Sequence, residues 1–210
     1  MSNKKVIGLS GVARAGKDTF AAILEMKLQQ AGKSVKKVSL AGPLKQQCDS
    51  FLTSNLGISA FTQVTEEKNI MRPFLVWYGD AQRKRTDGRN WIEHANKEIQ
   101  ESNYDYYIVT DIRYDAYEKD ELYFLKNEVN GILCHISKFT MLGNPFQPDH
   151  KLFVQPANEH EALNDPKIRI AAHHRVQWRD VGKMSATELL HDPELTEHVD
   201  EFMIKYVNQR

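Results

Sequence analysis

A glycine-rich segment after the first apolar run constrains the fold of this chain more than any other feature. Residues 6–9 (Val-Ile-Gly-Leu) lead into Gly-Val-Ala-Arg-Ala-Gly-Lys-Asp-Thr at 11–19, and apolar residues then recur at helical spacing as far as Gly32. This order predicts a strand, a tight turn and a helix, whose backbone N–H groups turn inward to hold phosphate. The segment nearly fits G-x-x-x-x-G-K-[ST], the pattern whose lysine reaches the β- and γ-phosphates of a nucleotide. We therefore expect the chain to bind a nucleoside triphosphate.

The whole loop is a candidate nucleotide site. Asp18 stands where the pattern has Ser or Thr, so we expect Thr19 to supply the hydroxyl that contacts a magnesium ion. We expect Lys17 to be exposed until a nucleotide binds. The alternative is a glycine-rich turn with a surface lysine, which is less favoured because strand, glycines, lysine and helix all agree. The candidate residues are Gly11, Val12, Ala13, Arg14, Ala15, Gly16, Lys17, Asp18 and Thr19.

The charge balance limits the classes of partner. The chain has 28 basic and 28 acidic residues among 210, which argues against a nucleic acid or an anionic membrane, because both select a basic excess. The two cysteines, Cys48 and Cys134, lack metal-ligand spacing and are expected to be reduced thiols. The N-terminal apolar run is too short for a signal peptide or a membrane span. We therefore expect a cytoplasmic protein.

Alternating strand and helix patterns predict an α/β fold: a parallel sheet of about five strands with helices on both faces. The expected strands are residues 6–10, 34–40, 106–110, 131–137 and 167–171. Helix starts are expected at capping boxes in 90–93 and 115–118 and at Ser185 and Asp192. The helix after Asp192 carries an apolar stripe that we assign to the core.

The carboxyl end of the third expected strand is a second candidate site. Ligands of parallel sheets bind at the carboxyl ends of the strands, where the phosphate loop, residues 41–43 and Asp111 all fall. We expect Asp111 to hold a magnesium-bound water and Arg113 to face phosphate charge. The alternative is a helix cap followed by an exposed arginine.

Basic and aromatic residues accumulate between the second and third expected strands, in a segment too long for a simple crossover. A second substrate bound there needs cations for a phosphate and a flat surface for a base. The residues at 83–85 (Arg-Lys-Arg) equally fit a solvated charge run at a helix end, whereas Arg72, beside Pro73 in an apolar segment, is the stronger candidate. The candidate acceptor-binding residues are Lys45, Arg72, Trp77, Tyr78, Arg83 and Trp91.

Three segments together resemble a known family. They are Gly-Lys-Asp-Thr at 16–19, Leu-Ala-Gly-Pro-Leu-Lys at 40–45 and Tyr-Asp-Tyr-Tyr-Ile-Val-Thr-Asp-Ile-Arg at 104–113, and they are similar to the deoxynucleoside monophosphate kinases of tailed bacteriophages. A weaker similarity follows at Asn-Glu-His-Glu, 158–161. The resemblance covers about the first 170 residues and includes Asp18, since Gly-Lys-Asp-Thr is typical of these kinases.

The resemblance implies a single P-loop kinase domain that uses ATP and Mg²⁺ to phosphorylate deoxynucleoside monophosphates, with no nucleic acid or membrane partner and a possible homodimer. It implies a core (1–41, 104–137 and 159–210), a monophosphate-binding insert (about 42–103) and a lid (about 138–158). Two departures from the family stand out. Six residues after Asp111, where the family often has an acidic residue, this chain has Tyr117, and the lid segment holds no arginine. The candidate cations for the transferring phosphate are therefore Lys17, Arg14, Arg113, Arg169, Arg175 and Arg179.

Two rival functions remain open. Another small-molecule kinase on the same scaffold would act on phosphomevalonate or dephospho-coenzyme A. A nucleotide-dependent switch would bind ATP without phosphorylating a metabolite. The aromatic residues of the insert favour an acceptor that carries a base.

Overall fold

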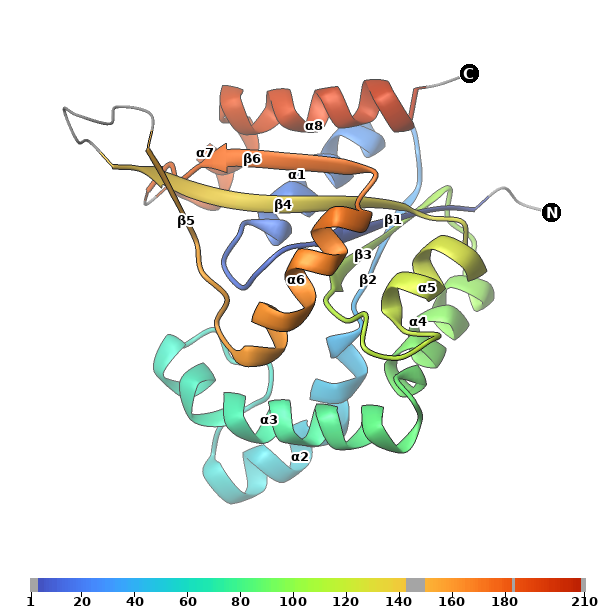
Figure 1. The fold of residues 1–210 in the computed structure, drawn as a ribbon, viewed down its shortest axis with the longest axis vertical. Helices are drawn as coiled ribbons and strands as arrows, with labels where there is room; N and C mark the ends of the chain where they lie inside the picture. Colours follow the sequence, from blue (N-terminus) through green and yellow to red (C-terminus); the bar gives the residue numbers. More distant parts are fainter. Residues whose placement is uncertain (1–3, 143–149, 183, 209–210) are drawn as a thin grey trace.

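A parallel sheet lies at the centre of the molecule (Figure 1). The structure is a computed structural model and describes residues 4–142, 150–182 and 184–208. In the described residues the parallel strands run in the order β2-β3-β1-β4-β6, and the short β5 pairs antiparallel with the end of β4. The strands are β1 (Lys5–Ser10), β2 (Val35–Val38), β3 (Tyr106–Ile112), β4 (Ile132–Met141), β5 (Lys151–Phe153) and β6 (His174–Arg179).

Helices cover both faces of the sheet, which confirms the expected α/β architecture. One face packs against α1 (Lys17–Gln30) and α8 (Pro193–Tyr206), with α7 (Ala186–His191) beside them. The other packs against α4 (Arg89–Glu101), the turn formed by α5 (Glu121–Tyr123) and the π-helix Phe124–Glu128, and α6 (Glu159–Ala171), which crosses in front of the strands in Figure 1. No helix in the described part of the chain is long and apolar enough to cross a membrane.

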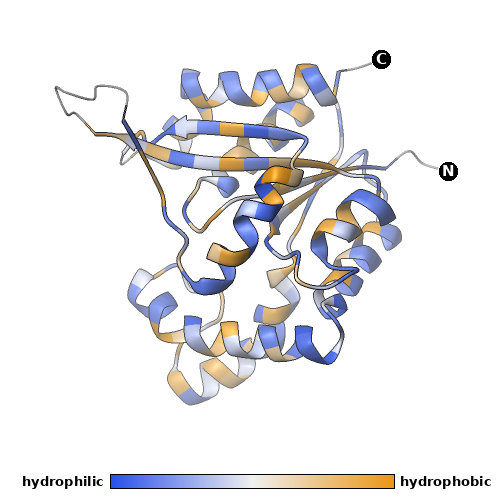
Figure 2. Cartoon of the chain, in the orientation of Figure 1, coloured by the Kyte–Doolittle hydropathy of each residue, from blue (hydrophilic) through white to orange (hydrophobic). Residues whose placement is uncertain are grey.

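Alternation along the strands divides the core between the two faces. Ile7 and Leu9 of β1 belong to the cluster under α1 and α8, whereas Val6 belongs to the cluster under α4. In β3, Ile108 and Tyr107 divide in the same way. Figure 2 shows the result, with apolar residues along the central strands and polar residues on the outer faces of the helices. Burial on both faces fixes the register of the strands.

The two helices between β2 and α4 form a layer of their own at the bottom of Figure 1. α2 (Ala41–Leu56) and α3 (Thr65–Arg85) pack around a small cluster of Cys48, Leu52, Ala60 and Met71. α4 instead belongs to the sheet cluster through Ile92. The two-helix layer therefore extends from the sheet at the carboxyl ends of β2 and β3.

One expected strand and two expected helix starts are wrong. Residues 167–171 alternate like a strand but continue α6, because Asn158 caps that helix and Ile168 packs it on the sheet; the strand is β6. α4 begins after Gly88 without a side-chain cap rather than with a capping box at 90–93. The helix expected from 115–118 begins at Glu121, where Asp120 accepts the first backbone N–H.

The expectations for the last two helices are confirmed. Ser185 forms a complete capping box and Asp192 accepts from the Leu195 N–H, so both expected caps are confirmed. The stripe on α8 is core, since Val199 and Phe202 are fully buried. Within the segment expected to form the lid, 138–158, residues 138–141 extend β4 and 151–153 form β5; residues 143–149 lie outside the described part.

The contact between the phosphate loop and β6 gives a first prediction. A Cβ at Gly16, which has φ +92°, would overlap the indole of the buried Trp178, whereas Gly32, with φ +73°, has open space around it. Gly16→Ala should therefore lower the free energy of unfolding by about 1–3 kcal/mol more than Gly32→Ala, which carries only the backbone strain. Urea unfolding of both variants measures the difference. If both variants lost the same free energy of unfolding, the Trp178 indole would have to move aside for the new methyl group without destabilising the protein.

Candidate active site

A cleft of about 650 Å³ opens between the carboxyl ends of the strands and α3. The phosphate loop forms one wall, the segment after β3 the back, and α2 and α3 the opposite wall. The acidic and basic side chains that line it are Arg14, Lys17, Asp18, Lys45, Lys68, Arg72, Asp80, Arg83, Asp111, Arg113, Glu121 and Lys138. Basic side chains therefore line both walls of the cleft.

The phosphate loop packs closely against β4 and β6. Gly11 has φ +132°, and a Cβ there would overlap the Ile136 carbonyl oxygen. The Trp178 indole N–H donates to the Ala15 carbonyl at 2.8 Å and fixes the far side of the loop. Arg14 also adopts a positive φ, of 66°, and its side chain is exposed at the cleft. The two glycines allow the close approach that this conformation needs.

Lys17 folds back onto its own loop. Its ammonium group donates to the carbonyl oxygens of Gly11 at 2.6 Å and Val12 at 2.9 Å, and the residue is 7% exposed. The expectation that Lys17 is exposed without nucleotide is therefore wrong, because the loop carbonyls solvate the ammonium group in place of water. Burial, and next the positive charge of Arg113, lower the pKa of Lys17 to about 8, against the pull of nearby carboxylates.

Asp111 caps the first turn of α2. Its carboxylate accepts from the backbone N–H groups of Leu40 at 2.9 Å and Ala41 at 3.0 Å, and from the Ser39 hydroxyl at 3.2 Å. The alternative of a helix cap is thus present in the structure. Because a carboxylate offers about four acceptor positions, the three bonds leave room for one more partner, such as a metal-bound water.

The residues beside the loop fit a magnesium ion. Thr19 and Asp111 both line the cleft, one from α1 and one from the end of β3. Within 4–142, 150–182 and 184–208, no cluster of three or more His, Cys, Asp or Glu side chains could hold a metal on its own. Mg²⁺ commonly uses one or two protein ligands together with water and substrate phosphates, so this sparse donor set suits it.

Only some of the predicted acceptor-binding residues line the cleft. Arg72 is exposed on the face of α3 that lines the cleft, and Lys45 faces it from α2. Trp91 lines the cleft but is buried, with its indole N–H directed at the Gly79 carbonyl. Trp77 and Tyr78 are not among the lining residues: Trp77 is 65% exposed, and the Tyr78 hydroxyl donates to Gln47 outside the cleft.

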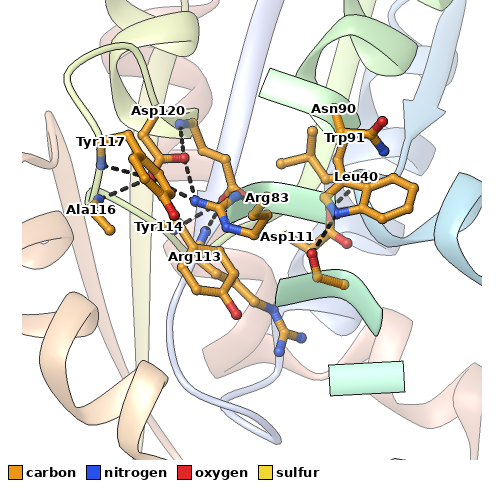
Figure 3. A network of polar contacts seen from close by, with 12 residues as sticks. Leu40, Arg83, Asn90, Trp91, Asp111, Arg113, Tyr114, Ala116, Tyr117 and Asp120 are labelled. Atoms are coloured by element: carbon orange, nitrogen blue, oxygen red, sulfur yellow. Dashed lines mark hydrogen bonds and ion pairs between the residues drawn. The ribbon is translucent and has the colours of Figure 1, made fainter. Parts of the chain in front are cut away.

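Arg83 is the centre of a buried ion network rather than part of a solvated charge run (Figure 3). Its guanidinium donates to Asp120 at 2.6 and 2.7 Å and to Glu121 at 3.0 Å, and lies 3.8 Å from the centre of the Tyr114 ring. Burial raises the pKa of Glu121 to about 8, opposed chiefly by the charge of Arg83. The neighbouring Lys84 and Arg85 are exposed, as expected for a charge run. The network ties α3 to the segment after β3.

Sequence reasoning missed several lining residues. Lys68 lies one helical turn before Arg72 on α3, so helical spacing could have found it once the helix was placed. Tyr114 and Lys138 carry no local pattern and reach the cleft only through the fold. Glu161 was noted only as part of a weak similarity, yet it pairs with Arg113 at 3.1 Å.

The phosphate loop and the parallel sheet place this protein in the P-loop class of nucleotide-binding proteins. A family model described as phosphomevalonate kinase matches residues 9–130, more than half of the chain, and the chain belongs to this family. Among solved structures, shikimate kinase from Acinetobacter baumannii in complex with shikimate is similar, with 14% identity and a TM-score of 0.45 over 99% of this chain and 97% of that one. No curated protein matches.

The low pKa of Lys17 predicts a pH-dependent affinity for ATP. A bound triphosphate favours the charged ammonium group and raises its pKa again, so binding takes up a proton once the pH exceeds about 8. Between pH 7.5 and 9.5 the affinity for a non-hydrolysable ATP analogue should fall on the order of tenfold. Calorimetry in buffers of different ionisation enthalpy measures the proton uptake. An affinity independent of pH would contradict the buried lysine.

The Arg83 network predicts a cost in stability. Arg83→Ala leaves Asp120 and Glu121 buried without their cation, so the free energy of unfolding should fall by about 3–5 kcal/mol. Lys84→Ala is the matched control, because the Lys84 side chain is exposed and pairs with Asp80 one helical turn earlier; it should leave stability nearly unchanged. Denaturant unfolding compares the two. A stable Arg83→Ala variant with weakened acceptor binding alone would restore Arg83 as a substrate residue.

Proposed function

We propose that this P-loop kinase transfers the γ-phosphoryl group of ATP to a deoxynucleoside 5′-monophosphate. The observation that carries the proposal is the cationic wall opposite the phosphate loop, formed by Lys68 and Arg72 of α3 and Lys45 of α2 within one cleft. Such a wall suits an acceptor that already bears a phosphate. The similarity of residues 16–19, 40–45 and 104–113 to the bacteriophage kinases supports the deoxynucleoside class.

The chemistry needs positioning and charge more than a base. The attacking oxygen of an acceptor phosphate is already anionic, so no side chain has to remove a proton. Lys17 and Arg113 both line the cleft, and in our proposal they bind the phosphate chain and stabilise charge on the transferring group. Mg²⁺, held near Thr19 and Asp111, would neutralise phosphate charge when bound. Water is excluded in our proposal by the arm of β4 and β5, which corresponds to the expected lid.

A second candidate function rests on the family match. The model described as phosphomevalonate kinase covers residues 9–130, which include the phosphate loop, the two-helix layer and Asp111. The cationic wall suits the phosphate of phosphomevalonate equally well. The aromatic lining, from Trp91 and Tyr114, favours an acceptor with a base.

A panel of acceptors tests the proposal. ATP consumption and diphosphate formation are measured with each deoxynucleoside monophosphate, its ribonucleotide counterpart, phosphomevalonate and dephospho-coenzyme A. We expect turnover to rise with deoxynucleoside monophosphates. Turnover with phosphomevalonate alone would replace our proposal by the second candidate, and ATP binding without turnover on any acceptor would favour a nucleotide-dependent switch.

Substitution of Arg72 is the most direct test of the acceptor site. A planar guanidinium forms paired hydrogen bonds to phosphate that an ammonium group cannot reproduce, so Arg72→Lys should raise the acceptor KM roughly tenfold or more while ATP affinity stays within about twofold. Arg85→Lys, on the same helix outside the cleft, is the control and should change neither. Titration of the monophosphate at saturating ATP provides the measurement. An unchanged acceptor KM would remove Arg72 from the acceptor site.

A further inference from the structure

Glu161, at the start of α6, holds two groups that a nucleotide would need. One carboxylate oxygen accepts from the Ala13 N–H of the phosphate loop at 3.1 Å, and the other accepts from the Arg113 guanidinium at 3.1 Å. The residue is 7% exposed, so these contacts are shielded from water. An acidic side chain thus sits among the phosphate-binding cations of the loop, and its negative charge acts on Lys17 as well.

The carboxylate competes with phosphate for the same donors. The loop binds phosphate through backbone N–H groups that point into it, and Ala13 is one of its residues. Arg113 lies at the cleft with its side chain 40% exposed, so it can rotate from Glu161 toward a ligand. A triphosphate carries more charge than one carboxylate and offers several acceptors, so it would draw both donors away.

Glu161 also connects the loop to the segment that follows β5. The oxygen that accepts from Ala13 accepts from the Ala157 N–H at 2.9 Å, directly before the Asn158 cap of α6. Three residues earlier, the Val154 N–H donates to the carbonyl of Lys138, which lines the cleft. Release of Glu161 would therefore loosen the junction between the β5 arm and α6.

We propose that Glu161 is a latch: in the nucleotide-free protein it binds the Ala13 N–H and Arg113, and it gives up both when a triphosphate binds. Arg113 is then transferred from an internal carboxylate to the phosphate chain, and the junction at 154–161 is freed in the same step. This inference rests on the nucleotide-binding part of the proposed function and not on the identity of the acceptor.

Two variants separate a latch from a general charge effect. Glu161→Asp keeps the charge but shortens the side chain, so it should lose the reach to Ala13 and Arg113 together. Glu161→Gln keeps the shape and removes the charge. Both should tighten the binding of a non-hydrolysable ATP analogue with Mg²⁺ by about fivefold or more, because the competing internal contacts are lost. Glu159→Gln, exposed in the same helical turn, is the control and should leave binding unchanged.

Hydrogen exchange of the wild-type protein gives a readout that needs no variant. Adding the analogue should speed exchange of the Ala157 amide, which loses its acceptor, while the Ala13 amide stays protected by phosphate. Tightening in Glu161→Gln alone would assign the effect to charge and overturn the latch. Unchanged or weaker binding in both variants, or unchanged exchange at Ala157, would also overturn it. No monophosphate is present, so failure of the acceptor assignment appears only in the acceptor panel.

Discussion

The close contact of the phosphate loop with β4 and β6 is the constraint on which the site depends. The loop can lie there only because Gly11 and Gly16 have no side chains to meet the Ile136 carbonyl and the Trp178 indole. The indole in turn donates to the Ala15 carbonyl, so the core of the sheet and the loop share one contact. Since Trp178 also packs against Phe20 of α1, the helix that follows the loop is fixed by the same side chain.

Three cations of the cleft are bound by groups of the protein itself. Lys17 is solvated by loop carbonyls, Arg113 by Glu161, and Arg83 by Asp120 and Glu121. These three arrangements differ in accessibility. The Arg113 side chain is 40% exposed and Lys17 is held by neutral carbonyl groups, whereas Arg83 is 3% exposed, bonded to two acidic side chains and stacked on Tyr114. A ligand can therefore recruit the first two, but removing Arg83 would leave the buried Asp120 and Glu121 without their cation.

The sequence predicts those parts of the molecule whose signals are local. The phosphate loop, the alternating strands and the caps at Ser185 and Asp192 depend on residues within a few positions of one another. The strand prediction for residues 167–171 is wrong because apolar and polar residues also alternate on this half-exposed helix. There Ile168 faces the sheet and Ile170 faces water. The roles of Arg83 and Glu161 could not be read in this way, because their partners lie 37 and 148 residues away in the chain.

Two carboxylates join separate segments of the chain beside the cleft. Asp111 holds the backbone N–H groups that begin α2, and so joins the two-helix layer to the end of β3. Glu161 holds the Ala13 and Ala157 N–H groups, and so joins α6 and the β5 arm to the phosphate loop. Both bind backbone donors beside the cleft, where phosphate and its metal ion would change the local field most. In the proposed function, a ligand there would reach both junctions, one at the start of α2 and one between the β5 arm and α6.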